Sequence, residues 1–202
     1  MTKGTYSRHH PGKYALAIDW ETSGSDFSGD SSATYQGLAF GAVIFSTETL
    51  EPVETLYREM QFDETKYQWS EDAVKVHGLT REHLATAGTR EEALIDLLEL
   101  IQKYIGTESK IMFLGHNVDF DIDFTNQLAR DHGIELKIHH VKLETSGAAF
   151  LLIGQYRSDD VFQFFTGRTR VGGHNALDDA LMALETARNM RAIVQDALSA
   201  EA

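Results

Sequence analysis

Short apolar runs, bounded by polar or turn-forming residues, recur in the first third of the chain. They predict three β-strands, over residues 14–20, 36–46 and 53–60. The last two runs are joined by a short turn around residues 47–52. Because strands with short connections usually pair with their neighbours in sequence, we expect an antiparallel meander.

Helical periodicity dominates the rest of the chain and alternates with two further apolar runs. The clearest helix follows a capping-box sequence, Thr-Arg-Glu-Glu, at residues 89–92 and ends at Gly106. Further strands are predicted at residues 110–114 and 136–143. The other predicted helices cover residues 70–77, 80–87, 118–132, 146–156 and 176–198. This order predicts an α/β fold with a mixed sheet and helices on both faces.

Length and composition indicate one domain. The chain has 202 residues, of which 42% are apolar, enough for a core of its own. We expect a single domain over residues 14–198, between a polar N-terminal tail of residues 1–13 and a short C-terminal tail of residues 199–202. No apolar run approaches the ~20 residues of a membrane span. The absence of cysteine excludes disulfides, thiolate zinc sites and cysteine nucleophiles, and fits a reducing, cytoplasmic location.

The net charge of the chain limits which nucleic acids it can bind. The chain has 18 Lys and Arg against 31 Asp and Glu, a net charge of −13. Proteins that grip long duplex DNA are usually basic, so extended duplex binding is disfavoured. An acidic chain can still bind nucleic acid if some of its carboxylates hold divalent metal ions.

Two carboxylates, Asp19 and Glu21, close the first predicted strand. Side chains two positions apart on a strand share a face and lie roughly 6.6 Å apart, while Trp20 points to the other face. Two such ligands can flank one divalent ion or bridge two ions about 3.5–4 Å apart. Solvated acids at a strand end explain the pair equally well, and a glycosidase acid–base pair is a remote alternative.

Two further acids lie on the apolar side of predicted helices. Asp121 aligns with Phe124 and Leu128 inside the apolar stripe of its helix. Asp179 lies at the edge of a stripe of small residues that can pack closely on the sheet, namely Ala176, Ala180, Ala183, Ala187 and Val194. It has no capping role, because Asn175 and the N3 acid, Asp178, fill that role. Burial of a carboxylate is costly unless it is paired or binds metal. A buried acid bonded to backbone or arginine remains the alternative for each position.

His174 precedes the last predicted helix by one loop position, after two glycines. From that loop its imidazole can approach Asp179 from outside the helix. A loop histidine is more often solvated than catalytic, but a base beside a metal-binding acid suits hydrolysis.

Three segments in this order resemble the motifs of the DEDDh family, the ribonuclease H-like 3′–5′ exonucleases. They are DWETSG at residues 19–24, GHNVDFD at 115–121 and HNALDDA at 174–180. The segment AVKVHGLT at 73–80 resembles the part that follows the sheet in proofreading-type members. The bulky Trp20 and a long polar segment, residues 25–35, depart from the usual pattern.

The resemblance implies a ribonuclease H-like five-stranded sheet, with three antiparallel strands followed by parallel ones. It also implies that Asp19, Glu21, Asp121 and Asp179 hold two Mg²⁺ or Mn²⁺ ions and that His174 is the general base. Possible substrate contacts are Thr22, Asn117, Phe120, Arg168 and Arg170, with Phe27, Tyr67 and Trp69 as candidates for base stacking. For Arg168 and Arg170 a solvated loop, and for the aromatic residues ordinary packing, are the alternatives.

These observations predict a metal-dependent 3′–5′ exonuclease that releases nucleoside 5′-monophosphates from single-stranded 3′ ends. DNA is the favoured substrate, and an RNA-directed enzyme of the RNase T or oligoribonuclease type is the alternative. A non-catalytic nuclease-fold module that binds nucleic acid or a polymerase is a remote alternative, because all five polar positions are present. A polymerase partner or a homodimer is compatible with the sequence, but no feature supports either.

Overall fold

A five-stranded mixed sheet forms the centre of the protein. The computed structural model describes residues 12–26, 29–106 and 108–200. The strands are β1 (Tyr14–Thr22), β2 (Gly37–Ser46), β3 (Pro52–Glu59), β4 (Phe113–Gly115) and β5 (Leu143–Glu144), in the spatial order β3-β2-β1-β4-β5. β1, β2 and β3 pair antiparallel, whereas β4 and β5 continue the sheet in parallel. The predicted fold class is therefore confirmed.

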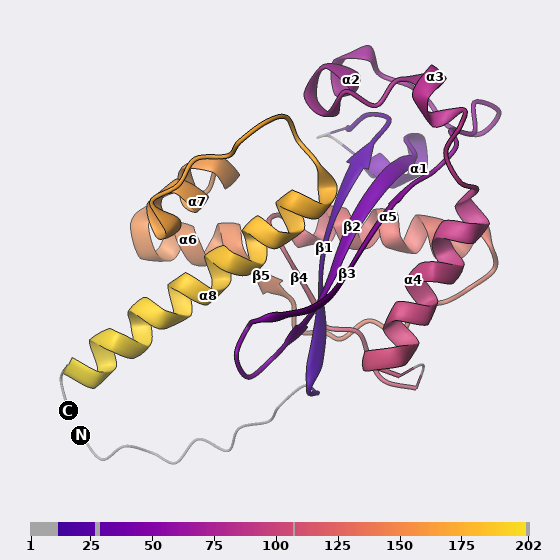
Figure 1. Cartoon of the computed structure of the whole chain (residues 1–202). Coiled ribbons are helices and arrows are strands. Elements are labelled where there is room, and N and C mark those ends of the chain that lie inside the picture. Colours follow the sequence, from indigo (N-terminus) through magenta and orange to yellow (C-terminus); the bar gives the residue numbers. More distant parts are fainter. Residues whose placement is uncertain (1–11, 27–28, 107, 201–202) are drawn as a thin grey trace.

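Helices cover both faces of this sheet (Figure 1). On one face α4 and α5 pack against Leu16, Ile18 and Trp20 of β1. On the other face α8 packs against the alanines of β1, Ala15 and Ala17. The helices are α1 (Ser31–Thr34), α2 (Glu71–His77), α3 (Arg81–Leu84), α4 (Arg90–Tyr104), α5 (Val118–Asp131), α6 (Thr145–Ile153), α7 (Ser158–Thr166) and α8 (Ala176–Ala200).

The start of α8 lies almost in contact with the backbone of β2. Gly41 is the point of contact, because a Cβ atom added there would lie 2.2 Å from the Cα of Leu177. Gly41 is also the register partner of Asp19 across β1 and β2. This close approach therefore brings the first turn of α8, including Asp179, to the end of β1.

Several predicted elements differ from the observed ones. Neither α1 nor α7 is among the predicted helices, and both are short and next to loops. The predicted strand at residues 136–143 is reduced to β5 and one isolated bridge at Ile138. The predicted helix at residues 80–87 is the single turn α3. Val194, expected in the small-residue stripe that packs on the sheet, is exposed because α8 extends beyond the sheet.

Two other expectations concern the N-terminal part of the chain and membrane spans. Phe27 and most of the predicted N-terminal tail lie outside the described residues. Within the described part of the chain, no helix combines the length and the apolar character needed to cross a bilayer.

Candidate active site

The C-terminal end of β1 holds Asp19 and Glu21 on the face that α8 covers. Trp20, between them, is buried in the opposite core, where its indole N–H donates to Thr125 Oγ1 at 2.9 Å. The alternation predicted from the spacing is therefore present. Because Trp20 fixes the strand from the other side, both carboxylates point toward α8.

Asp121 reaches the same pocket from the first turn of α5. Its side chain is only 2% exposed, and its Oδ1 accepts a hydrogen bond from the backbone N–H of Trp20 at 3.1 Å. Burial raises the pKa of Asp121 well above its usual range, although this hydrogen bond favours the ionised form. The bond links α5 directly to the strand that carries the other two acids.

Asp179 completes the group from the first turn of α8. Asn175 caps this helix, because its Oδ1 accepts from the backbone N–H groups of Leu177 at 3.1 Å and Asp178 at 3.3 Å. Asp179 Oδ2 lies 3.1 Å from His174 Nδ1, and its Oδ1 forms an ion pair with Arg170. The predicted proximity of His174 and Asp179 is thus observed.

The four carboxylates interact electrostatically. Burial raises the pKa of Asp19 well above normal, and the negative charges of Asp121, Asp179 and Glu21 raise it further. Burial and the charge of Asp179 raise the pKa of Glu21 to about 7. Burial also raises the pKa of Asp179, against the opposing effect of Arg170. The four acids therefore resist simultaneous ionisation, and a positive charge in the pocket is needed for all four to ionise.

The pocket fits a divalent cation by its donor atoms. One carboxylate oxygen each from Glu21 and Asp179 and one ring nitrogen of His174 lie within 4.8 Å of one another. Glu21 Oε1 is buried and has no hydrogen-bond partner among the residues that the structure describes. A buried carboxylate oxygen without a donor is costly, and coordination of a hard cation would satisfy it.

The C-terminal end of α2 and the residues after it close one side of the pocket. His77 Nδ1 accepts from the backbone N–H of Leu79 at 3.0 Å, so its Nε2 carries the hydrogen that faces the carbonyl of Thr22 at 3.1 Å. Burial lowers the pKa of His77, which favours this neutral form. A cavity of about 220 Å³ lies between this segment, Glu21 and His174. The HGLT part of the sequence therefore borders the acids.

The other predicted substrate contacts have different surroundings. Thr22 donates its hydroxyl to the carbonyl of Gly24 at 2.8 Å, and Phe120 packs against the core. Asn117 has a left-handed backbone conformation, with φ of 67°. Arg168 is exposed and pairs with Glu185, as expected for a solvated loop.

Arg170 lies in the acidic pocket, whereas the aromatic candidates Tyr67 and Trp69 have structural roles elsewhere. A solvated position is wrong for Arg170, whose side chain is only 11% exposed and lies inside the acidic pocket. Tyr67 is buried, and its hydroxyl donates to Asp131 at 2.6 Å, while Trp69 packs against Phe62. Packing and hydrogen bonding thus account for both aromatic residues.

Sequence reasoning missed Glu144, which holds the turn before α5. Its Oε1 accepts from the backbone N–H groups of Asn117 at 2.9 Å and Ser146 at 2.8 Å, and its Oε2 accepts from that of Val118 at 2.7 Å. The signal available was an acid at the end of a predicted strand, directly before a helix. Glu144 therefore fixes the helix start that carries Asp121.

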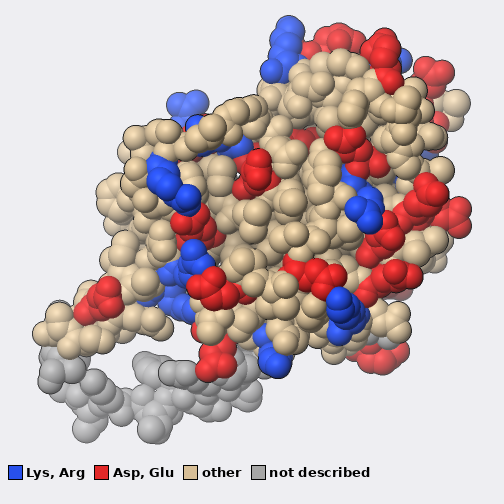
Figure 2. Space-filling model, in the orientation of Figure 1, with Lys and Arg blue, Asp and Glu red and all other residues tan. Residues whose placement is uncertain are grey.

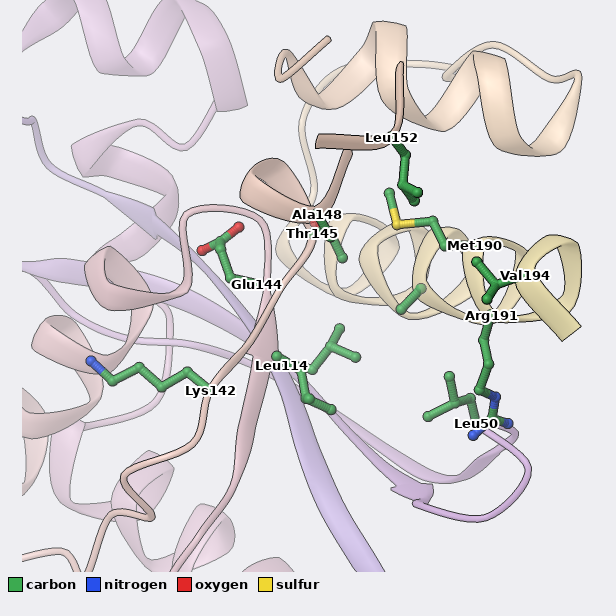
Figure 3. Close-up of a pocket in the computed structure, with 12 residues that line it drawn as sticks. Leu50, Leu114, Lys142, Glu144, Thr145, Ala148, Leu152, Met190, Arg191 and Val194 are labelled. Carbon is green, nitrogen blue, oxygen red and sulfur yellow. The ribbon is translucent and has the colours of Figure 1, made fainter. Parts of the chain in front are cut away.

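Two surface features lie apart from the acids. An apolar groove of about 420 Å³ between β4, β5, α6 and α8 is lined by residues such as Leu114, Met190 and Val194 (Figure 3). It contains none of the predicted site residues. On the face seen in Figure 2, acidic side chains are widespread and basic ones are scattered among them, without a continuous basic stripe over the described residues.

Comparison with known proteins identifies the class. A family model described as Exonuclease, of the RNase T type, matches residues 16–187. The chain therefore belongs to this exonuclease family of nucleic-acid-hydrolysing enzymes, and the predicted resemblance to the DEDDh exonucleases is confirmed. No curated protein matches the sequence.

Solved structures share the fold. The nuclease domain of 3′hExo, described as a DEDDh family member bound to rAMP, is 20% identical with a TM-score of 0.66, and the match covers 92% of this chain and 93% of that one. Exonuclease I is 17% identical with a TM-score of 0.71, over 89% of this chain and 41% of that one. E. coli exonuclease I with a 5cy-dT13 oligonucleotide is 18% identical with a TM-score of 0.69, over 90% and 41%. This chain thus spans less than half of exonuclease I.

Proposed function

We propose that this enzyme is a two-metal-ion 3′–5′ exonuclease that releases nucleoside 5′-monophosphates from single-stranded nucleic acid. Membership of the exonuclease family supports this reaction class. The observation that carries the mechanism is the shared pocket of four carboxylates, from β1, α5 and α8, whose pKa values are all raised. Such a pocket is stable in its ionised form only with positive charge inside it.

In this proposal Asp19, Glu21, Asp121 and Asp179 hold two Mg²⁺ or Mn²⁺ ions. When bound, the ions lower the pKa of a water molecule and stabilise charge on the departing 3′ oxygen. Carboxylate oxygens are hard ligands, which favours Mg²⁺ or Mn²⁺ over zinc. A zinc-bound form of an E. coli exonuclease I–DNA complex nevertheless makes zinc the natural comparison in metal titrations.

His174 is the general base. Its Nδ1 lies 3.1 Å from Asp179, and a hydrogen on Nδ1 donated to that carboxylate leaves the lone pair of Nε2 to accept a proton from water. The side chain is 41% exposed, so the base can pass the proton to solvent. Asp179 thus orients the base as well as holding metal.

The proposed polymer is DNA, with RNA as the alternative. Residues 73–80 resemble proofreading-type domains, and exonuclease I was solved with a dT13 oligonucleotide. The nuclease domain of 3′hExo, solved with rAMP, and a 3′-exonuclease structure described as recognising a histone mRNA stem-loop support RNA. Among the described residues, Arg170 is the only lysine or arginine that pairs with the pocket acids, which suits an enzyme that holds only a few nucleotides at a 3′ end.

The test is degradation of matched DNA and RNA oligonucleotides that carry a label at the 5′ end. We expect progressive shortening from the 3′ end in Mg²⁺ or Mn²⁺, none in EDTA, and faster loss of the DNA strand. Asp19→Ala abolishes shortening in this proposal. Intact strands with wild-type protein, or equal activity of Asp19→Ala, would overturn the proposed mechanism, and faster RNA degradation would reverse the substrate assignment.

A further inference from the structure

Arg170 places a positive charge inside the acidic pocket. Its Nη1 pairs with Asp179 Oδ1, and its Nε donates to Asp159 Oδ1 at 2.8 Å. The side chains of Arg170 and Asp179 are 11% and 9% exposed, whereas that of Asp159 is 60% exposed. The guanidinium therefore joins a buried acid of the pocket to an acid at the surface.

No other lysine or arginine of the described residues forms an ion pair with the four pocket acids. The charge of Arg170 lowers the pKa values of Asp19, Glu21 and Asp179, against the upward effect of burial. Arg170 is thus the internal counterion of the pocket. Its removal would leave His174 as the one remaining basic partner of the four carboxylates within the described part of the chain.

Both oxygens of Asp179 are engaged, Oδ1 by Arg170 and Oδ2 by His174. A divalent ion bound to this carboxylate would lie close to the guanidinium, and two cations at one carboxylate repel each other. Arg170 also has a second partner outside the pocket, the surface acid Asp159. Gly172 and Gly173 separate Arg170 from α8, and Asp159 remains as its partner when Asp179 is released.

We propose that Arg170 stabilises the metal-free pocket and competes with divalent ions for Asp179. This inference rests on the proposed metal site. Arg170 is then a positioning residue, since it acts through Asp179, and its displacement is part of the free-energy change of metal binding. The coupling predicts that removing Arg170 strengthens metal binding and weakens the metal-free fold.

The experiment measures Mn²⁺ binding to the full chain by calorimetry, without nucleic acid, and thermal unfolding in EDTA. Arg170→Gln is expected to bind Mn²⁺ about tenfold more tightly than wild type, within the usual range of coupling between two ligands. In EDTA it should unfold at a lower temperature than wild type. Arg168→Gln, in the same loop but exposed and paired with Glu185, is the matched control and should change neither value.

A charge-conserving variant separates charge from loop geometry. Arg170→Lys is expected to bind Mn²⁺ within about threefold of wild type, because the ammonium retains the competing charge. Equal or weaker Mn²⁺ affinity in Arg170→Gln, or an equal gain in Arg168→Gln or Arg170→Lys, would overturn the inference. If wild type and Arg170→Gln both bind no Mn²⁺, the proposed metal site itself fails, which is a different result.

Discussion

Asp121 and Asp179 both lie in the first turn of a helix and point into the same pocket, but their partners differ in kind. Asp121 accepts a hydrogen bond from the backbone of β1, and its helix start is held by Glu144. Asp179 is held by two basic side chains, Arg170 and His174. One acid is therefore fixed by the sheet, and the other is fixed by partners that can be exchanged.

This difference indicates how a pocket of four acids can fold before it binds metal. The half formed by β1 and α5 supplies rigid geometry at the cost of buried negative charge. The half formed by α8 and its preceding loop supplies a replaceable positive charge. The two halves meet where α8 lies on Gly41, so the rigid half also sets where Asp179 is presented.

The largest effect is expected from the rigid half. Asp121→Asn keeps the oxygen that accepts from Trp20 but removes a charge that the metal ions need. We expect kcat on a single-stranded oligonucleotide to fall about 1000-fold, equivalent to about 4 kcal/mol of transition-state stabilisation. Thermal unfolding in EDTA should occur at an equal or higher temperature, because a buried carboxylate has been removed.

Asp123→Asn is the matched control for this change, since Asp123 is exposed on the same helix. It should retain wild-type activity. A fall of less than tenfold in Asp121→Asn, or a similar fall in both variants, would contradict the role assigned to the rigid half.

The next effect concerns the charge of the whole pocket. The pKa of Glu21 is raised from 4.5 to about 7, so between these pH values the folded metal-free protein binds more protons than the unfolded chain. The free energy of unfolding of the metal-free protein is therefore highest below about pH 4.5. It falls as pH rises toward 7, and Glu21 alone accounts for about 3 kcal/mol of this decrease. Asp19, Asp121 and Asp179 act in the same direction because their pKa values are also raised.

Urea unfolding in EDTA at pH 5 and pH 8 measures this loss. Acids whose pKa is lowered, such as Asp131, are already ionised at pH 5 and add little over this interval. Glu21→Gln should show a smaller difference between the two pH values than wild type. A free energy of unfolding that stays constant or increases toward pH 8 would argue against a strained acidic pocket.

A somewhat smaller effect is expected from the base in the α8 half. His174→Gln should lower kcat about 100-fold, near the lower end of the range for general base catalysis. Mn²⁺ affinity should stay within about threefold of wild type, because the four carboxylates remain. His140→Gln, at an exposed position, is the control, and nearly full activity of His174→Gln would exclude the role as base.

The sequence predicts the rigid half better than the α8 half, for a physical reason. Asp19, Glu21 and Asp121 lie on regular elements, where periodicity determines which face a side chain occupies. The role of Trp20 as the residue that faces the opposite core follows from the same rule.

Arg170 lies in a loop, where no periodicity indicates direction, so its burial could not be predicted. The helix α7 was missed because of its length, which is nine residues. It is short and lies between Gly154 and Gly167, and its acid Asp159 pairs with a residue eleven positions away. Likewise, β5 is only two residues long and pairs with β4 at two positions, so the apolar run at residues 136–143 does not mark it.

Glu144 lies between these two cases and carries the smallest predicted effect. Both of its oxygens accept backbone N–H groups at the start of α5 or α6, and a glutamine has only one oxygen to offer. In Glu144→Gln some of these N–H groups lose their acceptor, so the turn before Asp121 loosens. Because residues that orient metal ligands typically contribute 10- to 100-fold, we expect kcat to fall about tenfold and Mn²⁺ binding to weaken.

The charge of Glu144 makes a second, opposite contribution that sharpens the comparison of the two halves. Its carboxylate raises the pKa of Asp121, so its removal should favour ionised Asp121 and tighter metal binding. If alignment of α5 dominates, Glu144→Gln binds Mn²⁺ more weakly than wild type, and Glu135→Gln at an exposed position does not. Tighter binding with unchanged kcat would show that Asp121 needs no support from its helix start, and that the backbone bond from Trp20 alone fixes the rigid half.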